Sequence, residues 1–307
     1  MKIKRNPEWV QAALGASTRV RNMAKSRGVT VNRATNRNLA GRVRRAFDSD
    51  HADDFGFISL KRGSRMYVHE GVDPRADRGT RGLDLRVAGF TGTVNDLKAV
   101  LQKVLARVPA YEDGVRFFVD QLTVDAVHED DEPVQLGDGV YTLKIDVGMY
   151  APEQKEGLEV RVFESLTPRH LRGVTLYAQR REYALADKVQ AMVRKGIGNS
   201  RLRDYYDAFV LLTLHDIDVE IIARAFAKAF PLYQSTQYGF EVPTSAADIP
   251  ALSPTYAAVN EADWQKTRVK HAFAVPTPDL ATVCAIIRER IQPILDTVHT
   301  PGDGAAA

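Results

Sequence analysis

The chain has almost no cysteine and no long apolar segment, and each absence excludes a class of protein. Its one cysteine, Cys284, rules out a disulfide within the chain and lies in an apolar helical pattern, so we expect a small buried side chain there. No apolar run approaches the roughly 20 residues of a membrane span. The basic start of the sequence lacks the apolar stretch of a signal peptide. We therefore expect a cytoplasmic protein that does not bind membranes. Separately, we expect a monomer.

Short histidine spacings are also absent, because the seven histidines are scattered along the chain. Zinc ligands usually recur at close, regular spacings, so the sequence gives no indication of a zinc site.

Acidic residues are nearly missing from the first 46 positions, which carry twelve Lys/Arg and one acid, Glu8, a net charge of +11. The other 261 residues carry 30 basic and 38 acidic residues, a net charge of −8. A basic arm on an acidic body is typical of a protein that binds RNA or DNA. A solvated helical face and an acidic protein partner remain alternatives. The candidate RNA-binding residues are Arg19, Arg21, Lys25, Arg27, Arg42, Arg44 and Arg45.

Hydrophobic periodicity predicts an α/β (α+β) fold in four parts: a basic helical segment at 1–50, a mixed-sheet domain at 51–180, a helical domain at 181–300 and a disordered tail at 301–307. Alternating patterns predict strands at 57–60, 83–87, 114–119, 122–128, 140–149 and 158–164. Helical spacing predicts helices at 8–25, 33–47, 93–107, 181–195, 203–214, 217–229, 260–272 and 278–296, with a Pro/Ser-rich connection near 243–256. Thr93 is expected to cap the third of these helices, with Asp96 three residues on.

The densest group of candidate functional residues lies between Lys188 and Asp207. Lysine binds phosphate as a point charge, whereas arginine offers a planar fork to two oxygens. Because Asp204 and Asp207 are three residues apart, they lie on one face of a helix. We therefore predict a site that grips polyphosphate, against the alternatives of a surface lysine and an aspartate that caps a helix. A Gly/Asn loop follows the lysine helix and leads into a second helix. The second helix begins with Arg201, Arg203, Asp204, Tyr205, Tyr206 and Asp207. The two tyrosines suit either stacking on a base or packing in the core.

Candidate phosphate and metal ligands also lie in the mixed-sheet region. Gly63 and Ser64 follow a strand and open a helix, where backbone N–H groups point at an anion, although most such pairs are only turns. Asp84 lies on a strand, and position 82 shares its face, so a D-x-D pair there would hold two Mg²⁺ ions. Position 82 is Gly82, however. Asp146 is either a solvated polar residue or a further carboxylate on a strand neighbouring Asp84.

Together these segments resemble the AbiEii/AbiGii toxin family, a branch of the DNA polymerase β-like nucleotidyltransferases that includes the MenT toxins. The resemblance extends from about Arg19 to about Leu295. Its most specific part is YALADKVQAMVRKGIGNSRLRDYYDAFVL, which resembles the lysine helix and the Arg/Lys-Asp motif. The other parts are RVRNMAKSRGVTVNRATNRNLAGRVRRAF in the leading helices, SLKRGSRMY at the Gly-Ser motif and RGTRGLDLRV at the strand that normally carries D-x-D.

The resemblance implies a polymerase-β-like mixed sheet and transfer of a nucleotide from an NTP to an acceptor, with Mg²⁺ or Mn²⁺ as cofactor. For the MenT branch the acceptor is the 3′ end of tRNA, and its modification blocks aminoacylation and arrests growth. The family also implies an AbiEi-type antitoxin. Carried over to this chain, Gly63 and Ser64 would cradle the phosphates, Asp84 would bind metal, Lys188 would hold the triphosphate and Asp204 would complete the catalytic set. We add Arg201 and Arg203 as phosphate ligands and Asp146 as a second metal-binding carboxylate.

Gly82 departs from the family pattern, because it stands where the first Asp of D-x-D belongs. A two-metal site without one bridging carboxylate should bind its ions poorly. Two alternatives to a nucleotidyltransferase toxin therefore stay open. One is a phosphotransferase that acts on protein or RNA, and the other is a degenerate module that binds nucleic acid or the antitoxin.

Overall fold

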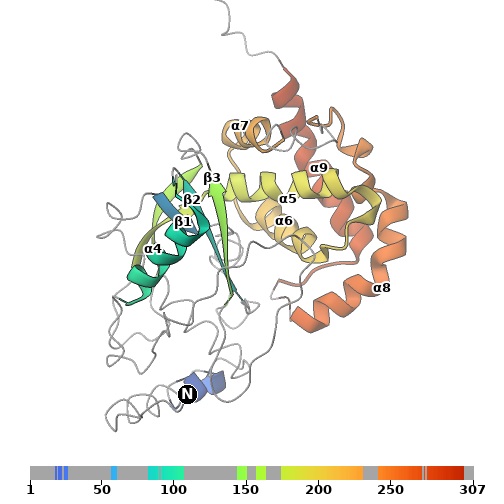
Figure 1. Cartoon of the computed structure of the whole chain (residues 1–307). Helices are drawn as coiled ribbons and strands as arrows, with labels where there is room; N and C mark the ends of the chain where they lie inside the picture. The colour runs from blue at the N-terminus through green and yellow to red at the C-terminus, as the bar shows by residue number, and fades with distance from the viewer. Residues whose placement is uncertain are drawn as a thin grey trace, which may run out of the picture. The chain divides into compact units, whose positions relative to one another are not determined.

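The computed structural model describes residues 18, 20–22, 24–26, 57–60, 82–88, 90, 92–106, 144–150, 157–163, 174–230, 241–271, 273 and 275–300. They fall into two compact units, one with the β-sheet and helix α4 and the other with the helices from α5 onward (Figure 1). The described residues between 18 and 26 are helical, as predicted, and Arg21 and Lys25 among them are exposed. Predictions that lie outside the described residues are the helix at 33–47, the strands at 114–119 and 122–128, the Gly63-Ser64 turn and the tail. The same holds for the candidate RNA-binding residues Arg19, Arg27, Arg42, Arg44 and Arg45.

The sheet of the first unit has five strands in the order β3-β2-β1-β5-β4. Strand β1 pairs antiparallel with β2 and parallel with β5, while β2 and β3 pair in parallel, so the sheet is mixed, as predicted. The strands are β1 (Phe57–Leu60), β2 (Gly82–Ala88), β3 (Lys144–Tyr150), β4 (Leu158–Phe163) and β5 (Val174–Gln179). Strand β5 was not predicted from the sequence, although Val174, Leu176 and Ala178 alternate as strand residues do.

The pairing of β2 with β3 sorts their residues by face. Asp84 pairs with Asp146, and Gly82 pairs with Lys144. Residues that face each other across neighbouring strands lie on the same side of a sheet, so these four positions share one face. The other face is apolar, since Leu83 and Leu85 pair with Ile145 and Val147, and both Leu85 and Val87 are buried.

Helix α4 (Val94–Ala106) begins where the sequence predicts. The Thr93 hydroxyl accepts a hydrogen bond from the Asp96 backbone N–H at 3.3 Å, and the Thr93 backbone N–H donates to Asp96 Oδ2 at 2.7 Å. This reciprocal pair is a capping box, which satisfies N–H groups that the first turn leaves without partners. The side-chain and backbone hydrogen bonds from Thr93 lower the pKa of Asp96. Leu97, Leu101 and Val104 form the buried stripe of the helix.

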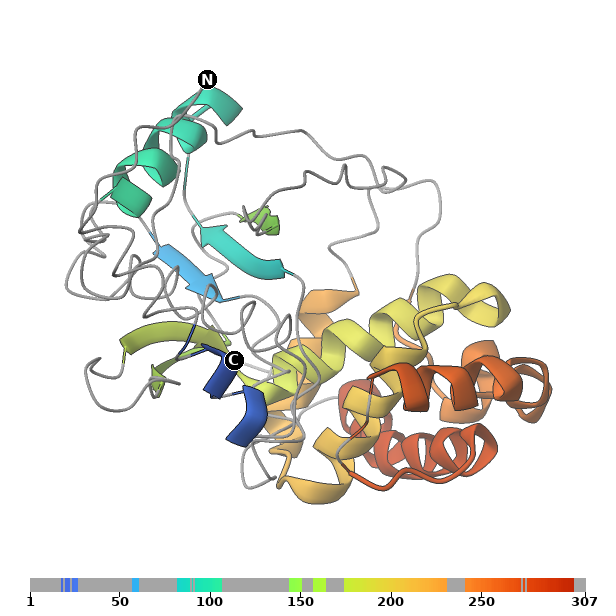
Figure 2. The same ribbon diagram turned by 90° about the horizontal axis from the view of Figure 1, so that it is seen from below.

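The second unit is helical. It contains α5 (Arg181–Lys195), α6 (Leu202–Leu214), α7 (Val219–Ala229), α8 (Pro254–His271) and α9 (Leu280–His299), with short 3₁₀ turns η5 (Gly196–Gly198), η7 (Ala246–Asp248) and η8 (Pro250–Leu252). Helix α9 packs against α6, α7 and α8, and α5 packs against α6 and α7. Figure 2 shows the same helices in a view turned by 90°. No helix among the described residues is long and apolar enough to cross a membrane.

Helix α8 begins at Pro254, whereas the predicted helix starts at 260, after a predicted connection near 243–256. That prediction was wrong because two start signals went unused. Ser253 stands just before the helix, and its hydroxyl accepts a hydrogen bond from the Tyr256 backbone N–H at 3.1 Å. Pro254 follows at the first helical position, where proline is favoured.

The core of the helical unit is rich in aromatic side chains. Trp264, Tyr205, Tyr206, Tyr256 and Phe226 are among its largest fully buried residues. Cys284 is buried on α9, as the sequence predicts, and desolvation raises the pKa of its thiol to about 12.

Candidate functional site

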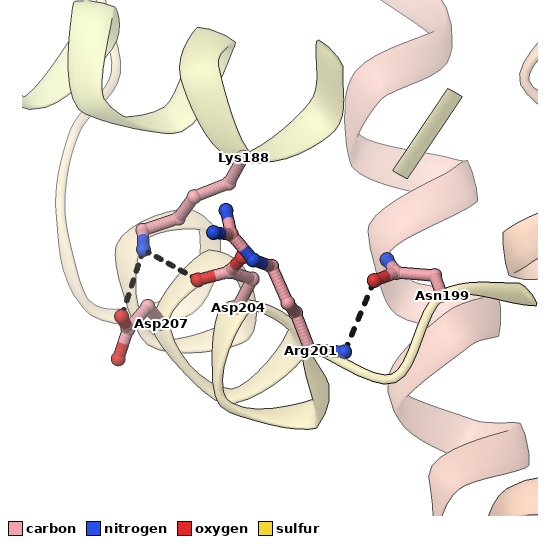
Figure 3. A network of polar contacts seen from close by, with 5 residues as sticks. All are labelled: Lys188, Asn199, Arg201, Asp204 and Asp207. Carbon is pink, nitrogen blue, oxygen red and sulfur yellow. Dashed lines mark hydrogen bonds and ion pairs between the residues drawn. The ribbon is translucent and has the colours of Figure 1, made fainter. Parts of the chain in front are cut away.

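Lys188 lies in the middle of α5 with its ammonium group inside the helical unit (Figure 3). Its neighbours along the helix, Leu185, Val189 and Met192, are all buried. The Lys188 side chain itself is only 8% exposed. The surface-lysine alternative is therefore wrong. Removing an ammonium group from water is costly unless an opposite charge compensates for it, so the partners of Lys188 decide what it does.

Those partners are two carboxylates of helix α6. The Lys188 Nζ atom lies 2.8 Å from Asp207 Oδ2 and 3.3 Å from Asp204 Oδ1. Asp207 is almost fully buried, with a side chain 2% exposed, whereas the Asp204 side chain is 21% exposed. The two aspartates thus lie on one helix face, as predicted, and neither is the N-cap of α6, which is Arg201. Asp204 is the aspartate predicted for the site, but Asp207 makes the shorter contact with Lys188.

Two tyrosines fix the rotation of α6 that turns both aspartates toward Lys188. Tyr205 stacks on Tyr256 with ring centroids 5.3 Å apart, and its hydroxyl donates to the backbone oxygen of Ala251 at 2.9 Å. Tyr206 stacks on Phe273 with ring centroids 3.8 Å apart. Both tyrosines are fully buried, so they belong to the core and the base-stacking alternative is excluded for the described conformation.

Burial keeps the phenols of this network neutral. Desolvation raises the pKa of Tyr256 to about 12 and raises the pKa of Tyr205 further. Both hydroxyls therefore remain hydrogen-bond donors at physiological pH. They position the backbone of the α5–α6 region and are unsuited to proton transfer.

The two arginines predicted to bind phosphate stand at the solvent side of the same region. Arg201 and Arg203 are exposed, at the start of α6 and one turn or less from Asp204. The backbone N–H of Arg201 donates to Asn199 Oδ1 at 3.0 Å (Figure 3). Asn199 is a structural residue that the sequence analysis missed. The signal available in the sequence was an asparagine in a Gly-rich turn, because an asparagine side chain often bonds the backbone two residues on.

The carboxylates predicted to bind metal lie in the sheet unit. Asp84 and Asp146 are paired in register on parallel strands β2 and β3, which confirms that the strand of Asp146 neighbours the strand of Asp84. Gly82 pairs with Lys144, so a lysine position takes the place across from the missing carboxylate. Among the residues described with their side chains, no group of three or more His, Cys, Asp and Glu gathers as a metal site. Asp84 and Asp146 are not in that set, so their metal binding stays a prediction, and Gly63 and Ser64 lie outside the described residues.

Comparison with known proteins adds one match. The family model described as "Nucleotidyl transferase AbiEii toxin, Type IV TA system" matches residues 71–286. That span includes Asp84, Asp146 and the whole Lys188–Asp207 segment. No curated protein matches the chain.

Proposed function

Because this chain belongs to the AbiEii family of nucleotidyl transferase toxins from type IV toxin–antitoxin systems, we propose that it transfers a nucleotide from an NTP to RNA. The acceptor in this proposal is the 3′ end of tRNA, and its modification blocks translation and arrests growth. The family places the toxin in a system with an antitoxin. We propose an AbiEi-type DNA-binding protein in that role and a cytoplasmic site of action.

The observation that carries the proposal is the buried Lys188 held between Asp204 and Asp207. Well-packed apolar side chains are often as stabilising as a buried ion pair, so packing alone gives little reason to keep a charge here. Binding of a triphosphate would give a reason to keep the charge of Lys188. Its oxygens can take over the longer, 3.3 Å contact made by the partly exposed Asp204, while the 2.8 Å contact to Asp207 keeps the ammonium group in place.

The neighbouring residues divide the remaining tasks. Arg201 and Arg203, exposed at the start of α6, would bind further phosphate oxygens through their planar forks. Asp204, once released from Lys188, would orient the acceptor hydroxyl and accept its proton, with Asp146 in a supporting role. The hydroxyl oxygen would bond to the α-phosphorus of the NTP, and pyrophosphate would leave. Gly63 and Ser64 would supply backbone and hydroxyl donors to the nucleotide phosphates.

Asp84 and Asp146 suit a magnesium ion. Carboxylate oxygens are ligands that Mg²⁺ favours, and paired strands lie about 4.8 Å apart, which allows two carboxylates to share one cation. When bound, Mg²⁺ would neutralise charge on the phosphate oxygens. Gly82 leaves one carboxylate fewer than a D-x-D pair provides, so we expect weaker metal binding than in relatives with both.

The basic N-terminal arm fits an RNA acceptor on electrostatic grounds. Its net charge of +11 would attract phosphates, and each phosphate contact steepens the salt dependence of binding. We therefore propose that Arg19, Arg21, Lys25, Arg27, Arg42, Arg44 and Arg45 bind the body of the RNA.

The experiment is incubation of the purified chain with total tRNA, Mg²⁺ and each NTP, labelled in turn on the α- or the γ-phosphate. Label from the α-phosphate on tRNA is the expected result. Label from the γ-phosphate alone would replace nucleotidyl transfer with phosphotransfer. RNA binding without any label would leave only a binding module. The same assay on Lys188→Met should show no transfer. Its matched control is Lys266→Met, since Lys266 is an exposed lysine on α8 outside the site.

A further inference from the structure

The segment that joins α5 to α6, residues 196–201, presents an unusual set of groups to solvent. We call it the α5–α6 loop. Ile197 is 61% exposed at its tip, which makes it one of the most exposed large apolar side chains among the described residues. Gly198, Ser200 and Arg201 are exposed beside it. An exposed apolar side chain at the tip of a loop is unfavourable in water. Beside two glycines and a cation, it is better suited to contact with another molecule.

The loop is held in place from below by Asn199, which is buried. Asn199 Nδ2 donates to the Tyr205 hydroxyl at 3.3 Å, and Asn199 Oδ1 accepts from the Arg201 backbone N–H at 3.0 Å. The Tyr256 hydroxyl donates to the backbone oxygen of Asn199. The loop also packs against η8. A surface held by this many bonds is preorganised, so binding there costs little ordering entropy.

The two glycines of the loop have different explanations. Gly196 has φ +51°, a left-handed conformation that glycine adopts most easily. Gly198 has no such constraint, and a Cβ atom built on it would meet nothing within 4 Å. Neither the backbone nor the packing therefore requires glycine at 198. What glycine provides there is an uncovered backbone, which another molecule can approach closely.

The charge of this region favours a polyanion. Residues 189–203 contain four basic residues and no acidic one. Lys195 immediately precedes the loop and Arg201 is its last residue, and both are exposed. Lys195 is seven residues from Lys188 along α5, which is about 10 Å of helix, so the loop lies within reach of one or two nucleotides from the proposed phosphate grip. A single-stranded RNA end exposes both phosphates and base faces, whereas a duplex hides its bases.

We propose that the α5–α6 loop binds the single-stranded end of the acceptor RNA beside Lys188. Lys195 and the uncovered backbone at Gly198 contact phosphate oxygens, and Ile197 packs against a base face. The identity of the ligand as RNA acceptor rests on the proposed function, whereas the existence of the binding surface rests on the loop itself.

The test is the affinity of loop variants for a fluorescent RNA hairpin with a single-stranded 3′ tail, measured by anisotropy. Lys195→Ala with Ile197→Ser should weaken binding about ten-fold and make the negative slope of log K against log salt shallower by about 0.7. Gly198→Ala should keep the wild-type melting temperature and still weaken binding several-fold. The matched control is Lys270→Ala with Val259→Ser, an exposed lysine and an exposed valine on α8. A blunt duplex should bind all variants alike.

The outcomes separate the loop from the proposed chemistry. Loop variants that bind the tailed RNA as tightly as the control overturn the loop proposal, even if the wild type transfers label to tRNA. Loop variants that lose RNA affinity support it, even if the wild type transfers no nucleotide, in which case the proposed reaction fails instead. Variants that keep RNA affinity but no longer associate with the antitoxin would make the loop a protein-docking surface and overturn RNA binding there. Unchanged affinity for a labelled NTP in the Lys195→Ala, Ile197→Ser variant shows that the site of Lys188 is intact.

Discussion

The Lys188 Nζ atom lies 2.8 Å from Asp207 Oδ2 in an interior where neither side chain is more than 8% exposed. This contact joins α5 to α6 and holds the only lysine that the structure describes as buried. Breaking one half of a buried pair leaves the other charge without compensation, which costs more than the pair contributes. Any variant of Lys188 therefore changes both the site and the fold, and experiments have to separate the two effects.

A double variant separates them. Lys188→Met alone should lower the free energy of unfolding by on the order of 3–5 kcal/mol, because Asp207 stays buried and charged. Adding Asp207→Asn removes that charge and should restore most of the stability. The double variant should still fail to transfer nucleotides, since the phosphate-binding cation is missing. Urea unfolding and the labelled-NTP assay provide the two readouts. A folded double variant with wild-type transfer would remove Lys188 from the mechanism.

Asp204 and Asp207 should respond differently to the same substitution. Asp207→Asn removes the buried partner and should destabilise the protein by about 3 kcal/mol or more. Asp204→Asn changes a longer, partly exposed contact and should cost at most about 1 kcal/mol. Its effect on transfer should be far larger, about 10²–10⁴-fold, if Asp204 accepts the acceptor proton. Equal losses of stability in the two variants, measured by urea unfolding, would contradict the different burial of these carboxylates.

Restoring a carboxylate with Gly82→Asp should strengthen Mg²⁺ binding and raise transfer. Position 82 lies in β2 and shares a face with Asp84 and Asp146, and its extended backbone is one that any residue adopts. Mg²⁺ affinity by calorimetry and the melting temperature give the result, with Gly82→Asn as the uncharged control. A stable Gly82→Asp protein with unchanged metal affinity would show that this strand does not hold the metal.

Cys284 should make the protein less stable at alkaline pH. Burial raises its pKa to about 12, whereas a thiol in the unfolded chain ionises near pH 8.5. Folding therefore keeps the thiol protonated, and its contribution to stability is intact below about pH 8.5 and falls as pH rises toward 12, by up to about 1.4 kcal/mol per pH unit. Urea unfolding of the wild type and of Cys284→Val at pH 8 and pH 10 should show a difference that changes with pH. A constant difference would mean that the thiol titrates alike in both states.

Elements with local signals could be predicted from the amino-acid sequence. The capping box of Thr93 and Asp96 and the apolar stripe after it identified α4 almost to the residue, since a helix start is decided within one turn. Lys188 and the α5–α6 segment were recognised from residue types and spacing, and the same segment lies within the family match. The start signals of α8 at Ser253 and Pro254 are equally local, so this helix start is also predictable from the sequence.

Contacts between distant segments could not be predicted in this way. Strand β5 is part of the sheet because it pairs with β1, a partner more than a hundred residues away that no local pattern reveals. The register of β2 and β3 sets Asp84 against Asp146 and Gly82 against Lys144. Helical spacing put Asp204 and Asp207 on one face, but the packing of Tyr205 and Tyr206 rotated that face toward α5 and buried Asp207 deeper than Asp204. Charge and hydrophobic periodicity are properties of the local sequence, whereas burial depends on contacts between segments that are far apart in the chain. Burial is what distinguishes Asp204 from Asp207.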